Sequence, residues 1–93
     1  LHILKDFQNI RVEVKIENKD ERAFNLAIAV REKQTTRIIK DLRITLLKNG
    51  VELESYLTHS GSVAFENISV GEYTVEISDI EKKVASVLLD IKQ

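Results

Sequence analysis

Between residues 42 and 77 the chain alternates hydrophobic and polar positions with the period of two that is typical of half-buried β-strands. Three turn dipeptides interrupt the alternation: Asn49-Gly50, Ser60-Gly61 and Val70-Gly71. Asn-Gly is well suited to a type I′ hairpin turn, because both central residues of that turn need a positive φ. The segment therefore predicts four antiparallel strands whose inward side chains are Leu42, Ile44, Leu46, Val51, Leu53, Val63, Phe65, Tyr73, Val75 and Ile77.

The flanking segments continue this pattern. Residues 10–17 alternate strictly between aliphatic and polar side chains, so they predict a further strand. A closing strand is predicted where Ala85, Val87, Leu89 and Ile91 share one face. With one more strand in the region between them, residues 1–93 are expected to form a single all-β domain, an antiparallel seven-stranded two-sheet sandwich.

Residues 20–42 are open to two interpretations. Phe24, Leu26, Ile28 and Val30 alternate with small side chains, which favours a strand with its large residues inward. A helix competes, because Asp20 is a suitable N-cap and several apolar residues recur at helical spacing. The strand is preferred, and the choice between the two stays open at this point.

The central segment also carries a more specific pattern: a strand ending in a Gly turn, a Thr ahead of a Gly, a Phe, and then Gly-x-Tyr-x-Val. This pattern resembles the transthyretin-like β-sandwich modules, which include Cna-B-type repeats of bacterial surface proteins and carboxypeptidase regulatory-like domains. It covers residues 42–78, and the resemblance implies a non-catalytic stalk, spacer or binding surface. The matching residues are Leu46, Asn49, Gly50, Thr58, Gly61, Phe65, Ile68, Gly71, Tyr73 and Val75.

The chain departs from that family at the positions that carry chemistry. Cna-B-type domains often form an internal isopeptide bond, catalysed by a buried acid four residues after the tyrosine. That position is Ile77 here, and Glu76 is one residue out of register and is expected to face solvent. Lys15 and Asp90 are conceivable bond partners, but without a buried carboxyl the reaction has no catalyst.

Composition narrows the classes of function. The 93 residues contain no cysteine, which removes disulfides, zinc-thiolate sites and thiol nucleophiles. The net charge is −1 with both signs interspersed, so no basic patch for nucleic acid is predicted. No apolar run has the length of a membrane-spanning helix, so no membrane insertion by this fragment is expected. The chain contains no methionine, and we expect it to be a fragment of a larger protein.

Few side chains suggest catalysis or metal binding. His2 and His59 are far apart in sequence, and a contact between His59 and Ser60 is a poor candidate for a catalytic pair because no nucleophile elbow is present. Asp79, Glu81 and Asp90 lack the glycine turn and the clustered oxygens of a calcium loop. No catalytic, metal or cofactor-binding residue is therefore predicted.

Three apolar residues are expected on outward faces: Leu47, Val84 and Leu88. We predict that they contact a neighbouring domain or a protein partner, and unpaired edge strands are a second potential contact surface.

The sequence thus favours a non-enzymatic accessory or interaction module of a larger, bacterial protein, which positions neighbouring domains or binds a partner. Two alternatives stay open. One is a regulatory tail of an anti-sigma-type signalling protein that proteolysis releases. The other is a small-ligand or carbohydrate-binding module of a secreted enzyme, for which Tyr56 is the aromatic candidate.

Overall fold

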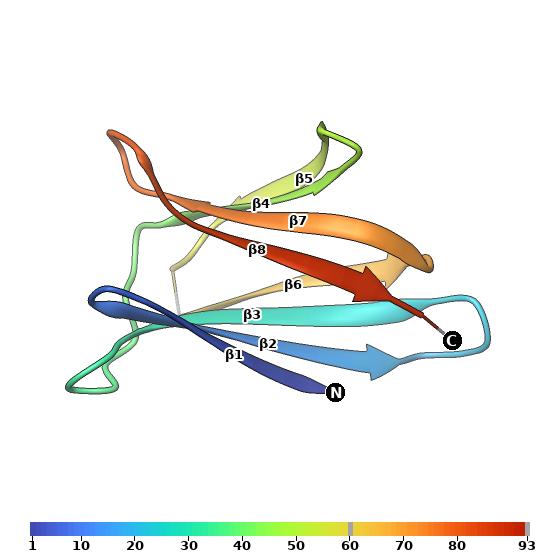
Figure 1. Ribbon diagram of the computed structural model, residues 1–93, viewed down its shortest axis with the longest axis horizontal. Coiled ribbons are helices and arrows are strands. Elements are labelled where there is room, and N and C mark those ends of the chain that lie inside the picture. The colour runs from blue at the N-terminus through green and yellow to red at the C-terminus, as the bar shows by residue number, and fades with distance from the viewer. Residues whose placement is uncertain (60, 93) are drawn as a thin grey trace.

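The computed structural model describes residues 1–59 and 61–92, and within them the chain forms two antiparallel four-stranded sheets in a sandwich-like arrangement (Figure 1). One sheet has the strand order β1-β2-β3-β6 and the other has the order β5-β4-β7-β8. The strands are β1 (His2–Phe7), β2 (Ile10–Asn18), β3 (Phe24–Glu32), β4 (Arg43–Lys48), β5 (Val51–Leu57), β6 (Ser62–Ile68), β7 (Gly71–Ser78) and β8 (Lys83–Ile91).

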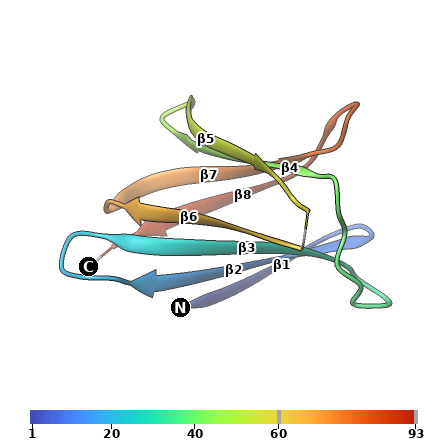
Figure 2. The ribbon, with the colours of Figure 1, turned by 180° about the vertical axis from the view of Figure 1, so that it is seen from behind.

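Each sheet is built from hairpins and joined by a non-sequential strand pair. Strands β1, β2 and β3 follow one another as hairpins, and β6 then pairs with β3. In the second sheet β4–β5 and β7–β8 are hairpins, and β7 pairs with β4. Strands β1 and β8 lie on the side nearest the viewer in Figure 1, and β5 and β6 lie nearest in Figure 2. The fold therefore has two open sides, each bordered by one edge strand of each sheet.

The core consists of the inward positions of both sheets, as the period-two pattern predicts. Phe65 is the largest of the fully buried side chains. The cluster also takes in Val12, Val14, Ile16, Phe24, Leu26, Ile28, Val30, Leu42, Ile44, Leu46, Val63, Ile68, Tyr73, Val75, Ile77, Ala85, Val87, Leu89 and Ile91.

The predicted count of seven strands is wrong, because the described residues form eight. The additional strand is β1, whose inward positions are Ile3, Lys5 and Phe7. Lys5 is tolerated there because β1 is an edge strand and the side chain is exposed. That lysine breaks the alternation by which a strand is recognised.

The region from 20 to 42 resolves in favour of the strand. β3 places Phe24, Leu26, Ile28 and Val30 in the core, and the helical alternative is wrong. After β3 the chain crosses to the other sheet through a loop that pairs with β3 at an isolated bridge between Arg31 and Ile38.

Thr58 fastens this crossing loop to the end of β5. Its side chain is fully buried, and its Oγ1 accepts a hydrogen bond from the Leu42 N–H (3.0 Å) and donates one to the Ile39 carbonyl (3.4 Å). Its own N–H donates to the Leu42 carbonyl (2.7 Å), and the Asp41 N–H donates to its carbonyl (2.8 Å). One threonine therefore satisfies most of the backbone polar groups where two chain segments meet.

Two turns between strands depend on the chemistry of particular residues. Asn49 and Gly50 have φ values of 54° and 76°, which confirms the predicted type I′ geometry. At the β6–β7 turn the Tyr73 hydroxyl donates to the Ser69 carbonyl (2.9 Å), a tyrosine corner that ties the start of β7 to the preceding turn.

Candidate interaction surface

The outer face of sheet β5-β4-β7-β8 carries a row formed by Leu47, Thr74 and Leu88, which the register places directly opposite one another. We call these three residues the Leu88 patch. Leu88 is 80% exposed, more than any other large hydrophobic side chain in the described strands. Leu47 and Thr74 are half-buried beside it. Leu88 stands beside Leu47 in one row, and such a row, unlike a lone exposed leucine, is a surface that a contact with another molecule would cover.

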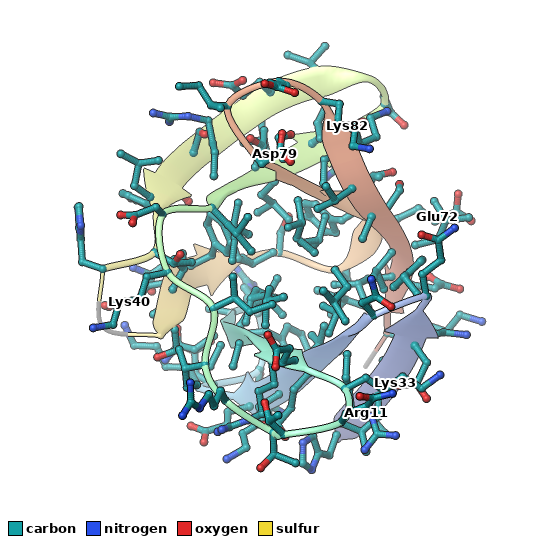
Figure 3. The ribbon with its side chains drawn as sticks, turned by 90° about the vertical axis from the view of Figure 1, so that its left-hand side faces the viewer. Arg11, Lys33, Lys40, Glu72, Asp79 and Lys82 are labelled. Carbon is teal, nitrogen blue, oxygen red and sulfur yellow. The ribbon has the colours of Figure 1, made fainter. Side chains whose placement is uncertain are left out.

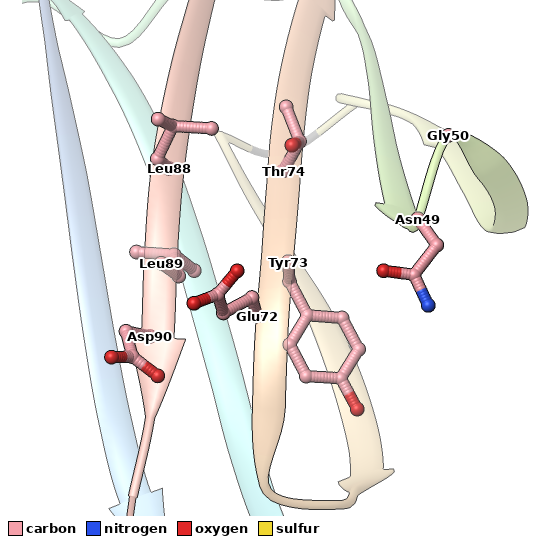
Figure 4. A pocket seen from close by; sticks show the side chains of 8 residues that line it. All are labelled: Asn49, Gly50, Glu72, Tyr73, Thr74, Leu88, Leu89 and Asp90. Carbon is pink, nitrogen blue, oxygen red and sulfur yellow. The ribbon is translucent and has the colours of Figure 1, made fainter.

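The surface next to Leu88 is hollowed. A shallow depression of about 370 Å³ lies along β7 and β8 beside the Asn49-Gly50 turn (Figure 4). Glu72 and Asp90 face each other across the two strands at its border. Directly opposed like charges are destabilising, and the Lys92 ammonium, 3.3 Å from the Asp90 carboxylate, is the cation that offsets them. The Leu88 patch is thus apolar with an acidic border.

Val84 does not belong to this patch. The register of β7 and β8 shifts between Ile77, which pairs with Ala85, and Ser78, which pairs with Lys83. Val84 is therefore the extra residue of a β-bulge, and it packs against the core. The outward position that the sequence predicts for Val84 is corrected by this bulge, whereas Leu47 and Leu88 do lie on the outer face.

The residues considered for an isopeptide bond are held apart by the fold. Lys15 is exposed on the outer face of the β1-β2-β3-β6 sheet, and Asp90 is exposed on the outer face of the other sheet. Between them Ile77 is fully buried, and Glu76 lies on the outer face, where it forms an ion pair with Lys83 (2.8 Å). These side chains point in directions that do not allow them to meet.

The two histidines lie in different parts of the structure. His2 lies in β1, with its Nε2 3.5 Å from a Glu13 carboxylate oxygen, and His59 is exposed in the β5–β6 connection. Ser60, its neighbour in the predicted turn, lies outside the described residues.

The acidic residues near the start of β8 are engaged in a turn. The Asp79 carboxylate accepts the N–H groups of Glu81 and Lys82 (both 2.8 Å), and these hydrogen bonds lower the pKa of Asp79. Asp90 lies at the other end of β8. In residues 1–59 and 61–92 no three histidine or acidic side chains are grouped as metal ligands.

The end of the fold where the loops gather carries charged side chains of both signs, among them Arg11, Lys33, Lys40, Asp79 and Lys82 (Figure 3). Arg11 binds Asp6 through its Nε (2.7 Å) and its Nη2 (3.1 Å), and the Lys33 ammonium is 3.7 Å from the same carboxylate. The guanidinium of Arg11 holds the pKa of Asp6 below its ordinary value. Arg11 and Lys33 at this end thus share a carboxylate.

The buried polar residues in the described part of the chain are Thr45 and Thr58. Thr58 is saturated by the crossing loop, and the Thr45 hydroxyl shares a hydrogen bond with Ser55 (3.0 Å). Titratable side chains in the described residues lie at the surface or partly exposed, except Tyr73, which is buried and donates its hydroxyl hydrogen to the Ser69 carbonyl (2.9 Å).

The sequence predicts unpaired edge strands as a second contact surface without identifying them, and one of these edges is β5. Val51 and Leu53 are predicted inward but are 63% and 48% exposed. A bulge shifts the register between Leu46, which pairs with Glu54, and Leu47, which pairs with Glu52. Beyond the bulge the inward positions pass to Glu54 and Tyr56, because a one-residue shift exchanges the two faces of a strand.

Tyr56 consequently packs inward instead of standing free in a loop. Its ring lies 5.5 Å from that of Phe65, centroid to centroid, and so closes the open side between β5 and β6. Its hydroxyl donates to the Glu54 carboxylate (2.7 Å). That hydrogen bond, the negative charge of Glu54, partial burial and the charge of Glu66 all raise the pKa of Tyr56.

Comparisons with protein-family models, with curated proteins and with solved structures gave no match to this chain. Residues 1–59 and 61–92 contain no helix with the length and apolar character needed to cross a membrane.

Proposed function

We propose that this chain is a non-enzymatic interaction module that binds a protein partner through the Leu88 patch. The observation that carries the proposal is the 80% exposure of Leu88 within a regular strand, in a row with Leu47 and beside a depression. Burying one leucine contributes about 1.5–3 kcal/mol, enough to make this side chain the centre of a small interface.

The border of the patch indicates the character of the partner. Glu72 and Asp90 lie at one end of the depression. A partner surface with an apolar centre and a lysine or arginine at its rim would match both features. We further propose the transthyretin-like assignment and a place as an accessory module of a larger bacterial protein, which the resemblance over residues 42–78 supports.

Carbohydrate binding has less support, because the ring of Tyr56 lies at 44° against that of Phe65 on the inward side of β5 and does not stand free in a loop. A non-enzymatic role is supported by the engagement of charged groups in structural contacts, because Asp6 and Glu76 lie in ion pairs and Asp79 caps a turn.

The test is affinity capture from lysate with the wild-type chain, Leu88→Glu and the matched control Leu4→Glu. Leu4 is 51% exposed on the outer face of the other sheet, so both variants place a carboxylate at an exposed strand leucine. We expect Leu88→Glu to lose specific proteins that wild type and Leu4→Glu retain, with affinity for an identified partner lower by about tenfold or more. Retention of the same proteins by Leu88→Glu would show that the patch is not the binding surface.

A further inference from the structure

A second surface, distinct from the Leu88 patch, lies on the open side bordered by β5 and β6 (Figure 2). β5 is an edge strand with the sequence VELESYL, which contains neither proline nor lysine; its protection against an added strand comes from its glutamates and its bulge, which disfavour an acidic strand more than a cationic one. Its apolar side chains are unusually exposed: Val51 63%, Leu53 48%, Tyr56 44% and Leu57 44%.

The hydrogen bonds of Thr58 show which backbone groups of β5 are free. Paired residues in an antiparallel ladder alternate between hydrogen-bonded and non-hydrogen-bonded pairs. Because the Thr58 N–H donates to the Leu42 carbonyl, the pairs at positions 56 and 54 in the same register are also directed toward β4. Ser55 and Leu57 therefore direct their N–H and C=O groups away from β4. These groups form a short template for an added strand.

The charged side chains of β5 and β6 are all acidic. Strands β5 and β6 carry three glutamates, Glu52, Glu54 and Glu66, and no lysine or arginine. Glu54 lies on the inward face of β5 beside Tyr56. On the outer face Arg43 donates to the Ser55 hydroxyl (3.0 Å), so a cation is already present there. A partner strand is thus expected to place cations toward Glu54 and apolar side chains toward Leu57.

A second copy of this chain fits less well. Antiparallel self-pairing through Ser55 and Leu57 would be centred on Tyr56, and it would bring together two β5/β6 sides that carry glutamates and no lysine or arginine, an arrangement that like-charge repulsion disfavours. An oppositely charged strand turns the same interaction into a favourable one.

We propose that the β5 edge, Glu54–Leu57, binds an extended peptide segment with lysine or arginine at alternate positions, which adds a fifth strand to sheet β5-β4-β7-β8. Main-chain hydrogen bonds to Ser55 and Leu57 hold the segment, and its cations face Glu54. The bulge before Glu54 bends the strand and limits the template to this short stretch.

The test uses synthetic eight-residue peptides with blocked termini: one alternates lysine and valine, one alternates glutamate and valine, and one is the lysine peptide N-methylated at alternate residues. Binding is followed by NMR, together with amide hydrogen exchange. We expect saturable binding of the lysine peptide alone, with slower exchange at Ser55 and Leu57 and little change at Glu54 and Tyr56, which β4 already protects. Glu54→Lys should weaken binding by about tenfold, and Leu88→Glu should leave it unchanged.

Each other outcome overturns the proposal. Equal binding of the N-methylated peptide would show that only charge is recognised. Protection outside β5, or no binding of the lysine peptide, would show that the edge does not accept a strand. A dimer of the chain alone with Ser55 and Leu57 protected would identify a second copy as the occupant. Because the capture experiment depends on Leu88 and this one does not, failure of either leaves the other interpretable.

Discussion

The two open sides of the fold are closed in different ways. On the β1/β8 side Ile3, Phe7 and Val84 pack against the core at partial burial. On the β5/β6 side a single aromatic contact, Tyr56 on Phe65, spans the gap between the sheets. Several partly buried side chains therefore close the β1/β8 side, whereas one contact between two aromatic rings closes the β5/β6 side.

The charges follow the same division. Strands β1 and β8 each contain a lysine and an aspartate, and Asp6 and Lys83 form ion pairs with residues of neighbouring segments. In the described residues none of the ion pairs involves β5 or β6, although both strands carry glutamate. Paired charges protect an edge, whereas carboxylates without a cation select the kind of strand that can approach it. This difference gives the β5/β6 side its potential for binding.

The largest effect on stability is expected from removing the ring of Phe65, which contacts Tyr56 on the β5/β6 side. Phe65→Ala removes a fully buried ring and should lower the free energy of unfolding by about 3–5 kcal/mol. Phe7→Ala, the matched change on the β1/β8 side, removes a partly buried ring and should cost roughly 1–3 kcal/mol. Urea unfolding of both variants measures the difference. Equal losses would contradict the distinction between the two sides.

A smaller effect is expected at the point where the chain enters the β5/β6 side. Thr58→Val keeps the volume of the side chain but removes the acceptor for the Leu42 N–H and the donor to Ile39. A buried donor without a partner costs about 1–3 kcal/mol, so the free energy of unfolding should fall by that amount. Thr58→Ser, which keeps the hydroxyl, serves as the control and should retain more stability than the valine variant. If the two variants lose stability equally, the hydroxyl does not hold the crossing loop.

The pattern of the sequence predicted the strands whose alternation is set by burial on one face. Strands β2, β4, β6, β7 and β8 have their inward residues where the period of two places them. The Asn49-Gly50 turn was predictable because its backbone conformation restricts which residues can occupy it. These features depend on one-sided burial and on the backbone conformation of a turn, both of which can be inferred from neighbouring residues in the sequence.

The remaining features depend on the position of a strand within its sheet. β1 escaped recognition because an edge strand can carry Lys5 at an inward position. The faces of β5 and the place of Val84 were misassigned because each bulge inserts one residue into a regular alternation. For the interaction surface, the outward positions of Leu47 and Leu88 followed from alternation. The β5 edge did not, because which strand ends a sheet is decided by long-range pairing.

The smallest expected effect is a change in the pKa of Tyr56, which depends on the glutamates of the β5/β6 side. The hydrogen bond to Glu54 and the charges of Glu54 and Glu66 raise the pKa of Tyr56, so the protonated phenol is favoured in the folded state. This contribution to stability is complete below the pKa of an unfolded tyrosine and is lost as the pH rises through the raised value in the folded protein.

Glu54→Gln should therefore lower the pKa of Tyr56, and Glu66→Gln should lower it by less, because Glu66 acts only through its charge. The absorbance of tyrosinate during alkaline titration measures both shifts, and Tyr56→Phe identifies the signal against that of Tyr73. An unchanged pKa in Glu54→Gln would mean that the carboxylates do not set the potential at this edge, and the attraction of a cationic strand would lose its physical basis.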